Sequence, residues 1–173
     1  GLIIGFFGFR FGLKGVYFVL LTIAFAEIGR LIFLHLKVFG SFQGLFITPQ
    51  FSFTNFQFKE NVPYYYIALG YVIFSLIVVR LMERSKIGRY IVALREDEDA
   101  AESLGVNVFK YKMIAIFISA FLTSLGGVFY TNYIYYLHPG TMMSMAFSIE
   151  IVLRPIIGGM GTVLGPVIGS FLI

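Results

Sequence analysis

The sequence has no cysteine and little charge, since only 13% of its 173 residues are Asp, Glu, Lys or Arg. Without cysteine, the chain forms no disulfide and offers no thiolate to a metal. The two histidines, His35 and His138, lie far apart and lack the spacing of a metal-binding pair. We therefore predict no metal site.

Two kinds of enzyme site are also missing. The sequence contains no Gly-rich loop ending in Gly-Lys-Ser or Gly-Lys-Thr, the pattern that binds nucleotide phosphates. No Ser/His/Asp or Cys/His set stands where it would form a hydrolytic centre. We predict that the chain is not an enzyme and has neither an ATPase site nor a cofactor of its own.

What the chain has in quantity is apolar residues, which make up 58% of it and give a mean hydropathy of +0.88. This share exceeds that of ordinary soluble domains and places the chain in a lipid bilayer. The net charge of +4 comes from basic residues beside the ends of apolar runs rather than along one face. That pattern indicates membrane orientation and argues against nucleic acid as a partner.

Three apolar runs are long enough to cross a membrane, since a bilayer needs roughly 20 residues of apolar helix. They cover residues 16–36, 64–82 and 113–136, and residues 2–9 look like the end of another span. We predict an all-α fold, a polytopic integral membrane bundle of helices. Residues 1–173 form a single transmembrane domain in this interpretation, and its apolar first and last residues indicate a fragment truncated at both ends.

The apolar stretch over residues 144–173 is interrupted by Arg154-Pro155 and by a glycine-rich run that begins at Gly158 and Gly159. Proline and glycine break helices, so we predict two broken or half-length helices near the C-terminus. Irregular backbone at membrane depth lines a cavity or is buried in protein. Close packing is the ordinary explanation here, and exposure of backbone groups to a solute is the functional alternative.

Two loops of different charge separate the long runs. Residues 80–112 carry many basic and acidic side chains, whereas residues 39–62 carry few. The positive-inside rule places the first of these loops in the cytoplasm and the second outside.

Within the inner loop, residues 94–104 are good helix formers without proline or glycine, and Gly105 follows them. We predict one short, exposed, acidic helix that ends at Gly105 in a left-handed turn. The adjacent Ala100 and Ala101 leave a shallow surface that fits a groove of another protein, and the acidic residues around them steer docking. The simpler alternative is a solvated acidic helix without a partner.

At this loop the sequence resembles a known family. Residues 95–107 closely resemble the cytoplasmic loop of branched-chain amino-acid ABC permeases of the LivM type. Asp99-Ala100-Ala101 with Gly105 is similar to the more general EAA loop of bacterial importer permeases, although Asp replaces the leading Glu and the Leu-Pro that often follows is absent. The segments 15–18, 22–27 and 157–169 resemble the same family in its order and spacing.

The resemblance implies the transmembrane permease subunit of an ATP-driven ABC importer for leucine, isoleucine and valine, in the cytoplasmic (inner) membrane of a bacterium. It implies a cytoplasmic coupling loop over residues 83–112 that docks on ABC ATPase subunits, which use the ATP. A second, related permease subunit and an extracytoplasmic solute-binding protein are further implied partners. The residues expected to carry coupling are Glu96, Asp97, Asp99, Ala100, Ala101 and Gly105.

Charged residues inside the apolar runs are candidates for a translocation pathway, because a charge at the bilayer centre is costly and rarely faces lipid. Glu27 and Arg30 lie three residues apart and Glu150 and Arg154 four apart, so each pair shares a helical face. A simple ion pair within the helix is the alternative. The predicted pathway set is Thr22, Glu27, Arg30, Glu150, Gly158 and Gly159, although a hydroxyl bonded to its own helix is the ordinary role of Thr22.

The sequence leaves two alternative functions open. Permeases that resemble this chain also serve urea, short amides and other amino acids, and span patterns do not separate these solutes. An ion-coupled secondary transporter, with Glu27 as its coupling carboxylate, would work without ATP. That second alternative leaves the acidic Ala-Ala loop unexplained.

Overall fold

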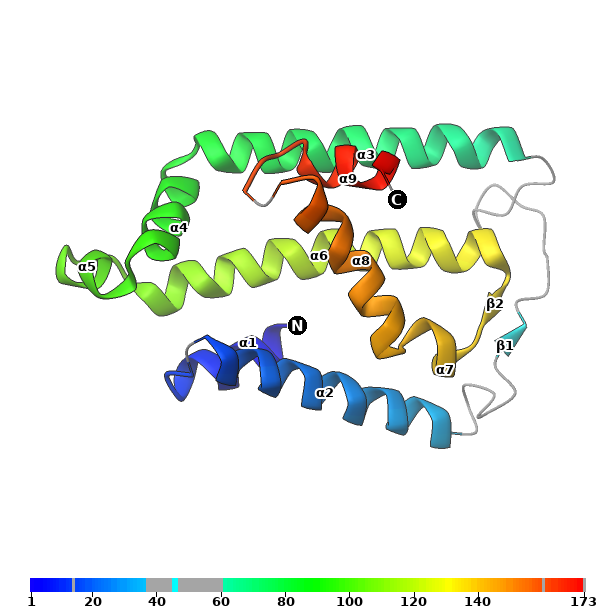
Figure 1. Cartoon of the computed structure of the whole chain (residues 1–173), viewed down its shortest axis with the longest axis horizontal. Coiled ribbons are helices and arrows are strands. Elements are labelled where there is room, and N and C mark those ends of the chain that lie inside the picture. The colour runs from blue at the N-terminus through cyan, green and yellow to red at the C-terminus, as the bar shows by residue number, and fades with distance from the viewer. Residues whose placement is uncertain (14, 37–44, 47–60, 160, 173) are drawn as a thin grey trace. The chain divides into compact units, whose positions relative to one another are not determined.

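A computed structural model describes residues 1–13, 15–36, 45–46, 61–159 and 161–172. The fold is all-α, as predicted (Figure 1). The helices are α1 (Leu2–Arg10), α2 (Val16–His35), α3 (Asn61–Arg84), α4 (Lys86–Glu96), α5 (Glu98–Ser103), α6 (Val108–Ile134), α7 (Pro139–Met142), α8 (Met145–Ile157) and α9 (Gly165–Leu172). Two short strands, β1 (Leu45–Phe46) and β2 (Tyr136–Leu137), pair antiparallel.

Three helices are long and apolar enough to cross a membrane, Val16–His35, Val62–Arg84 and Val108–Ile134. They confirm the predicted spans and make the chain a multi-pass membrane protein. The third span begins at Val108 rather than at residue 113, because the Asn107 side chain accepts a hydrogen bond from the Lys110 N–H at 2.9 Å and caps the helix. The predicted outer loop lies outside the described residues except for β1 and the start of α3.

The chain divides into two compact units, and the first comprises residues 1–25 and 77–128. Inside it, α1 packs against α6 through small residues. A Cβ built at Gly5 would lie 2.9 Å from the Ile116 side chain, so glycine lets the two helices approach closely. At the other end of α1, the Phe9 and Phe18 rings stack with their centroids 4.9 Å apart. This unit contains the inner loop over residues 80–112, hereafter the charged loop.

The second unit comprises residues 26–76 and 129–173. Tyr64 of α3 is only 5% exposed, and its ring packs against Phe129 and Tyr133 of α6. The Tyr64 hydroxyl shares a hydrogen bond with the hydroxyl of Tyr135, the residue that follows α6. These contacts hold the start of α3 against the end of α6.

Within the second unit, α8 and α9 fold back on each other (Figure 1). A Cβ built at Gly169 would lie 1.8 Å from the Arg154 carbonyl oxygen, so the backbones of the two helices touch. The connection contains Gly159 and Gly161 with φ of 104° and 90°, a backbone region that glycine adopts readily. The prediction of two half-length helices near the C-terminus is confirmed.

Candidate functional site

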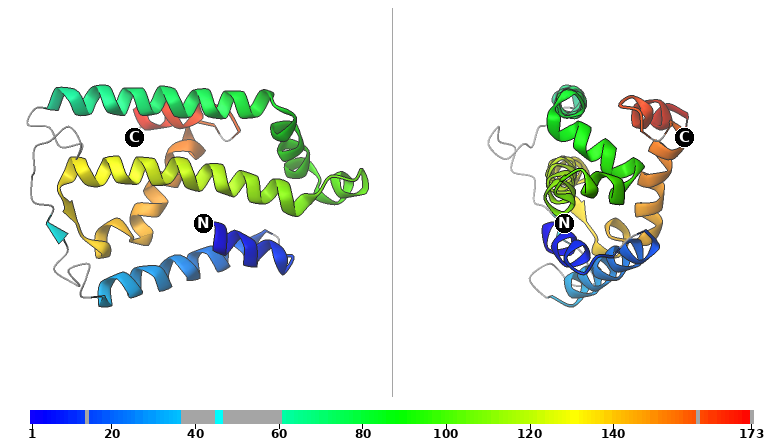
Figure 2. Two further views of the ribbon diagram at one scale, coloured as in Figure 1. Left: turned by 180° about the vertical axis from the view of Figure 1, so that it is seen from behind. Right: turned by 90° about the vertical axis from the view of Figure 1, so that its left-hand side faces the viewer.

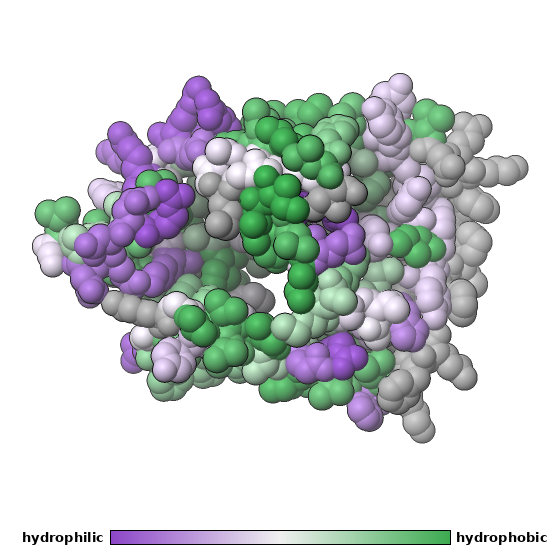
Figure 3. Space-filling view, in the orientation of Figure 1, coloured by the Kyte–Doolittle hydropathy of each residue, from purple (hydrophilic) through white to green (hydrophobic). Residues whose placement is uncertain are grey.

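The charged loop contains two short helices, α4 and α5, which connect α3 to α6 (Figure 2). Ser85 begins α4, because its hydroxyl accepts a hydrogen bond from the Gly88 N–H at 3.1 Å. A Cβ built at Gly88 would lie 2.1 Å from the Met82 carbonyl oxygen, so glycine permits the sharp turn out of α3. Figure 3 shows the hydrophilic side chains gathered over α4 and α5.

The predicted single helix over residues 94–104 is wrong, because the chain breaks at Asp97. This residue has an extended backbone, with φ −152° and ψ 110°, and separates α4 from α5. Its carboxylate accepts a hydrogen bond from the Ala100 N–H at 2.9 Å and so caps α5. Helix propensity did not reveal the break, since a capping Asp looks like any other residue within a run of acidic ones.

Gly105 ends α5 in a left-handed conformation with φ 83°, as predicted. The Gly105 N–H donates to the Glu102 carbonyl at 2.9 Å, and the Val106 N–H donates to the Ala101 carbonyl at 3.1 Å. These bonds satisfy carbonyl groups at the end of the helix. Asn107 then caps α6, so α5 is confined between two capped breaks.

The two alanines do not form the shallow surface that the sequence suggested. Ala100 is exposed, whereas Ala101 is only 4% exposed and packs inside its unit. Successive residues of an α-helix point about 100° apart, so adjacent side chains do not face the same way. The neighbouring Leu104, which the sequence analysis did not single out, is 85% exposed.

An ion pair that the sequence analysis missed fastens α5 to α6. The Lys112 Nζ lies 2.7 Å from a Glu98 carboxylate oxygen, and each side chain is 24% exposed. The same ammonium lies 5.3 Å from the centroid of the Phe9 ring in α1, a cation–π distance. A cavity of about 390 Å³ adjoins this group and also contacts Leu13 and Phe109. Because Glu98 and Lys112 belong to different helices, no helical spacing signals the pair.

The other predicted coupling residues lie on the surface of the same loop. Glu96 forms an ion pair with Arg95 at 2.6 Å, with both side chains more than 60% exposed. Such a pair contributes little to stability. Asp99 is exposed in the first turn of α5. The structure thus brings all six predicted coupling residues together at the end of α4, in α5 and in the turn after it.

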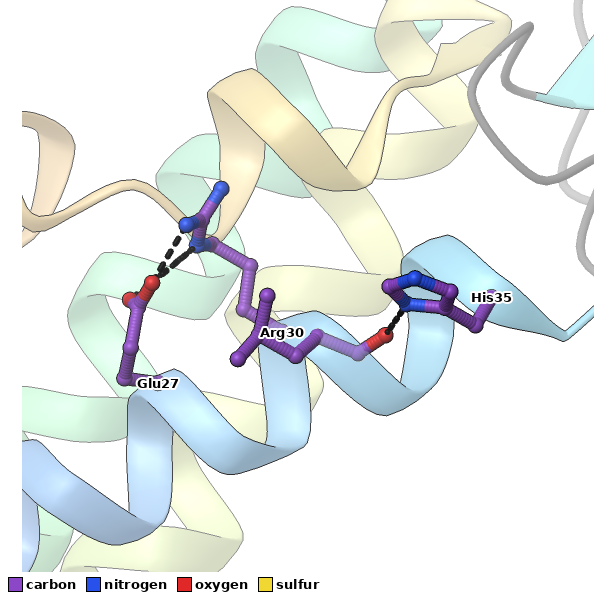
Figure 4. Close-up of polar contacts among 4 residues, drawn as sticks. Glu27, Arg30 and His35 are labelled. Carbon is purple, nitrogen blue, oxygen red and sulfur yellow. Dashed lines mark hydrogen bonds and ion pairs between the residues drawn. The ribbon is translucent and has the colours of Figure 1, made fainter.

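In α2, Glu27 and Arg30 form an ion pair along the helix (Figure 4). The Arg30 Nε donates to both oxygens of the Glu27 carboxylate at 3.0 Å. The Glu27 side chain is 46% exposed and that of Arg30 is 25% exposed. Charges at membrane depth avoid lipid, so their exposed atoms require a polar cavity or another subunit. The Thr22 hydroxyl donates to the Val19 carbonyl of its own helix at 2.8 Å, the ordinary role for a helical threonine.

In α8, Arg154 Nη2 lies 2.6 Å from a Glu150 carboxylate oxygen, so this pair also closes within its own helix. Gly158 follows α8, and a Cβ built there would lie 1.7 Å from the Gly165 carbonyl oxygen. Its place against α9 agrees with the packing explanation. Among the residues that the structure describes, no group of three or more His, Cys, Asp or Glu side chains is placed to hold a metal.

The sequence was compared with known families and proteins. A family model described as the permease component of the branched-chain amino acid transport system matches residues 1–173. The high-affinity branched-chain amino acid transport system permease protein LivM is 30% identical in Escherichia coli (strain K12) and 28% identical in Salmonella typhimurium (strain LT2), over 100% of this chain. The chain spans 46% of the length of each of these relatives.

A further relative is the ribose import permease protein RbsC of Haemophilus influenzae, which is 31% identical over 54% of this chain and 30% of its own length. No solved structure matches the chain.

Proposed function

Because this chain belongs to the family of permease components of branched-chain amino acid transport systems, we propose that it is the membrane-spanning permease subunit of an ATP-driven importer for branched-chain amino acids. The observation that carries the proposal is the capped acidic helix α5, held in a charged loop between two membrane-spanning helices. The family match over the whole chain supports the same function.

The proposal divides the work between subunits. This sequence has no phosphate-binding loop, so ATP is bound and hydrolysed by a separate ABC ATPase. Residues 83–112 face the cytoplasm and form the coupling loop, in which α5 receives the movement of the ATPase. Glu96, Asp97, Asp99, Ala100 and Gly105 are the residues we assign to this contact or to the shape of α5, and the buried Ala101 seats the helix.

The solute crosses the membrane in a pathway shared with a second, related permease subunit. The half-exposed Glu27–Arg30 pair in α2 supports this arrangement, because it needs polar surroundings that lipid does not supply. Glu150 and the backbone at Gly158 and Gly159 are the further candidates for the pathway. An extracytoplasmic binding protein delivers the solute, and the complex lies in the inner membrane of a bacterium.

Branched-chain amino acids are the proposed cargo because the family description and the printed names of the LivM relatives both refer to them. One relative is named as a ribose import permease, so a permease that resembles this chain is named for a different class of solute. Urea and short amides are further solute classes that the sequence leaves open, and urea represents them in the test.

Solute uptake into proteoliposomes tests the proposal. The liposomes hold the full-length permease, its partner permease and the ATPase, and the binding protein is supplied on the opposite side from ATP. Labelled leucine, urea and ribose are offered in parallel, with an ATPase variant that binds but does not hydrolyse ATP as the control. We expect uptake of leucine that the control abolishes. Uptake of urea or ribose instead of leucine would overturn the cargo and keep the transport class.

A further inference from the structure

Leu104 is the most exposed large apolar side chain described in the charged loop. It is 85% exposed at the C-cap of α5. Exposed apolar side chains are expected on α2, α3 and α6, because those helices are long and apolar enough to cross a membrane. Hydrophilic residues gather over α4 and α5 (Figure 3), as expected of a loop in water. Lipid therefore does not account for the exposure of Leu104.

The fold presents Leu104 on a fixed support. Asp97 caps the start of α5, Ala101 is buried beneath it, and Glu98 pairs with Lys112 of α6. Ala100 lies four residues before Leu104 and is also exposed, so the two side chains share one side of the helix. Ala100 and Leu104 together form an apolar ridge. Because the fold already holds this ridge in place, little conformational entropy is lost when a partner covers it.

Acidic side chains border this ridge. Asp97, Asp99 and Glu102 are exposed at the cap of α5 or within it, whereas the exposed Glu96 is already paired with Arg95. An apolar centre with charges at its rim is the usual composition of a protein interface, and the charges select a partner of opposite sign. The complementary surface is therefore an apolar pocket with Lys or Arg side chains at its rim.

We propose that Leu104 is the side chain that α5 inserts into the ATPase subunit, where it fills an apolar pocket rimmed by basic residues. This inference rests on the proposed function, which supplies the ATPase as the occupant of the ridge. In this proposal the centre of the contact is Leu104 rather than the Ala100–Ala101 pair. The matching surface of the ATPase is an apolar pocket with basic residues at its rim.

Single cysteines test the inference, because these 173 residues contain none of their own. In the full-length permease complex, freed of any other cysteine, Leu104→Cys, Ala101→Cys and Val92→Cys variants are reacted with a water-soluble maleimide, with and without saturating ATPase. Val92 of α4, which is 45% exposed, is the exposed control, and Ala101 is the buried control. We expect ATPase to slow labelling of the Leu104→Cys variant about tenfold or more. Labelling of the Val92→Cys variant stays unchanged, and that of the Ala101→Cys variant is slow throughout.

The affinity of the ATPase for the permease subunits in nanodiscs separates failure of this inference from failure of the proposed function. We expect Leu104→Ala to weaken binding about tenfold and Leu104→Met to keep it within about twofold, since methionine fills a similar volume. Rising salt weakens binding of the wild type and of both variants, because the rim is charged. If wild-type permease does not bind the ATPase, the proposed function fails. If it binds and the cysteine at position 104 stays reactive in the complex, the inference is wrong and the function stands.

Discussion

The Glu98 carboxylate lies 2.7 Å from the Lys112 ammonium, and this ion pair joins α5 to a membrane-spanning helix. Both side chains are 24% exposed, and the ammonium also lies over the Phe9 ring of α1. We expect a movement of α5 to be passed to α6 and α1 through this charged group as well as through the short turn that joins α5 to α6. In the proposed importer, this is the route by which the ATPase acts on the membrane helices.

Replacing Lys112 by Met should reduce the amount of solute transported per ATP hydrolysed by several-fold. The substitution keeps the length of the side chain, removes the charge and leaves Glu98 without its ionic partner. A double-mutant cycle with Glu98→Gln should give a coupling energy of about 1 kcal/mol. The reversed pair, Glu98→Lys with Lys112→Glu, should recover most of the coupling. If the Lys112→Met and Glu98→Gln single variants transported as much solute per ATP hydrolysed as the wild type, the ion pair would have no role in coupling.

Replacing Asp97 by Ala should weaken α5 by about 1 kcal/mol, because the Ala100 N–H loses its capping partner. Hydrogen exchange of the amides of residues 98–104 measures this change. Asp97→Asn is the matched control, since asparagine caps a helix about as well as aspartate but carries no charge. Slow exchange in the asparagine variant and fast exchange in the alanine variant are expected. Equally fast exchange in both would show that charge rather than capping holds α5, and equally slow exchange would show that Asp97 does not hold it.

The predictable part of the fold was the part that local sequence determines. The three membrane spans follow from run length and hydropathy, and the break after α8 follows from the glycines that begin at Gly158. The interruption predicted at Arg154-Pro155 is wrong, because Pro155 lies inside α8, which continues to Ile157. Gly105 was predictable because helices commonly end in a left-handed glycine.

The rest depends on contacts between residues distant in sequence or on the rotation of a helix. Glu98 and Lys112 meet only after α5 turns back to α6, and no pattern signals that approach. The burial of Ala101 and the exposure of Leu104 depend on which side of α5 faces its neighbours. Asp97 was assigned to the interior of a helix because its neighbours are equally acidic, whereas its side chain caps the next one.

Replacing Gly169 by Ala should destabilise the permease by about 1–3 kcal/mol, because the new Cβ meets the Arg154 carbonyl oxygen at 1.8 Å. Helix α9 then shifts away from α8. Thermal stability of the detergent-solubilised, full-length protein measures the loss. Gly70→Ala is the matched control, since nothing lies within 4 Å of a Cβ built there in α3. Equal stability of the two variants would mean that α8 and α9 are not in backbone contact.

Replacing Glu27 by Gln should lower the yield of folded permease, since Arg30 loses its carboxylate partner inside a span. Reversal of the pair, Glu27→Arg with Arg30→Glu, should restore the yield. If the pair also lines the translocation pathway, the reversed variant folds but transports poorly, because the charges facing the solute are exchanged. Full transport by the reversed variant would assign the pair to helix structure alone.

The source of energy for leucine uptake tests the central claim most directly. Proteoliposomes of the complete complex are given ATP in the presence of ionophores that abolish ion gradients, or an ion gradient in the absence of ATP. An ATP-driven permease predicts that leucine accumulates in the first condition and not in the second. Accumulation in the second condition, abolished by ionophores, would contradict the claim and establish an ion-coupled transporter.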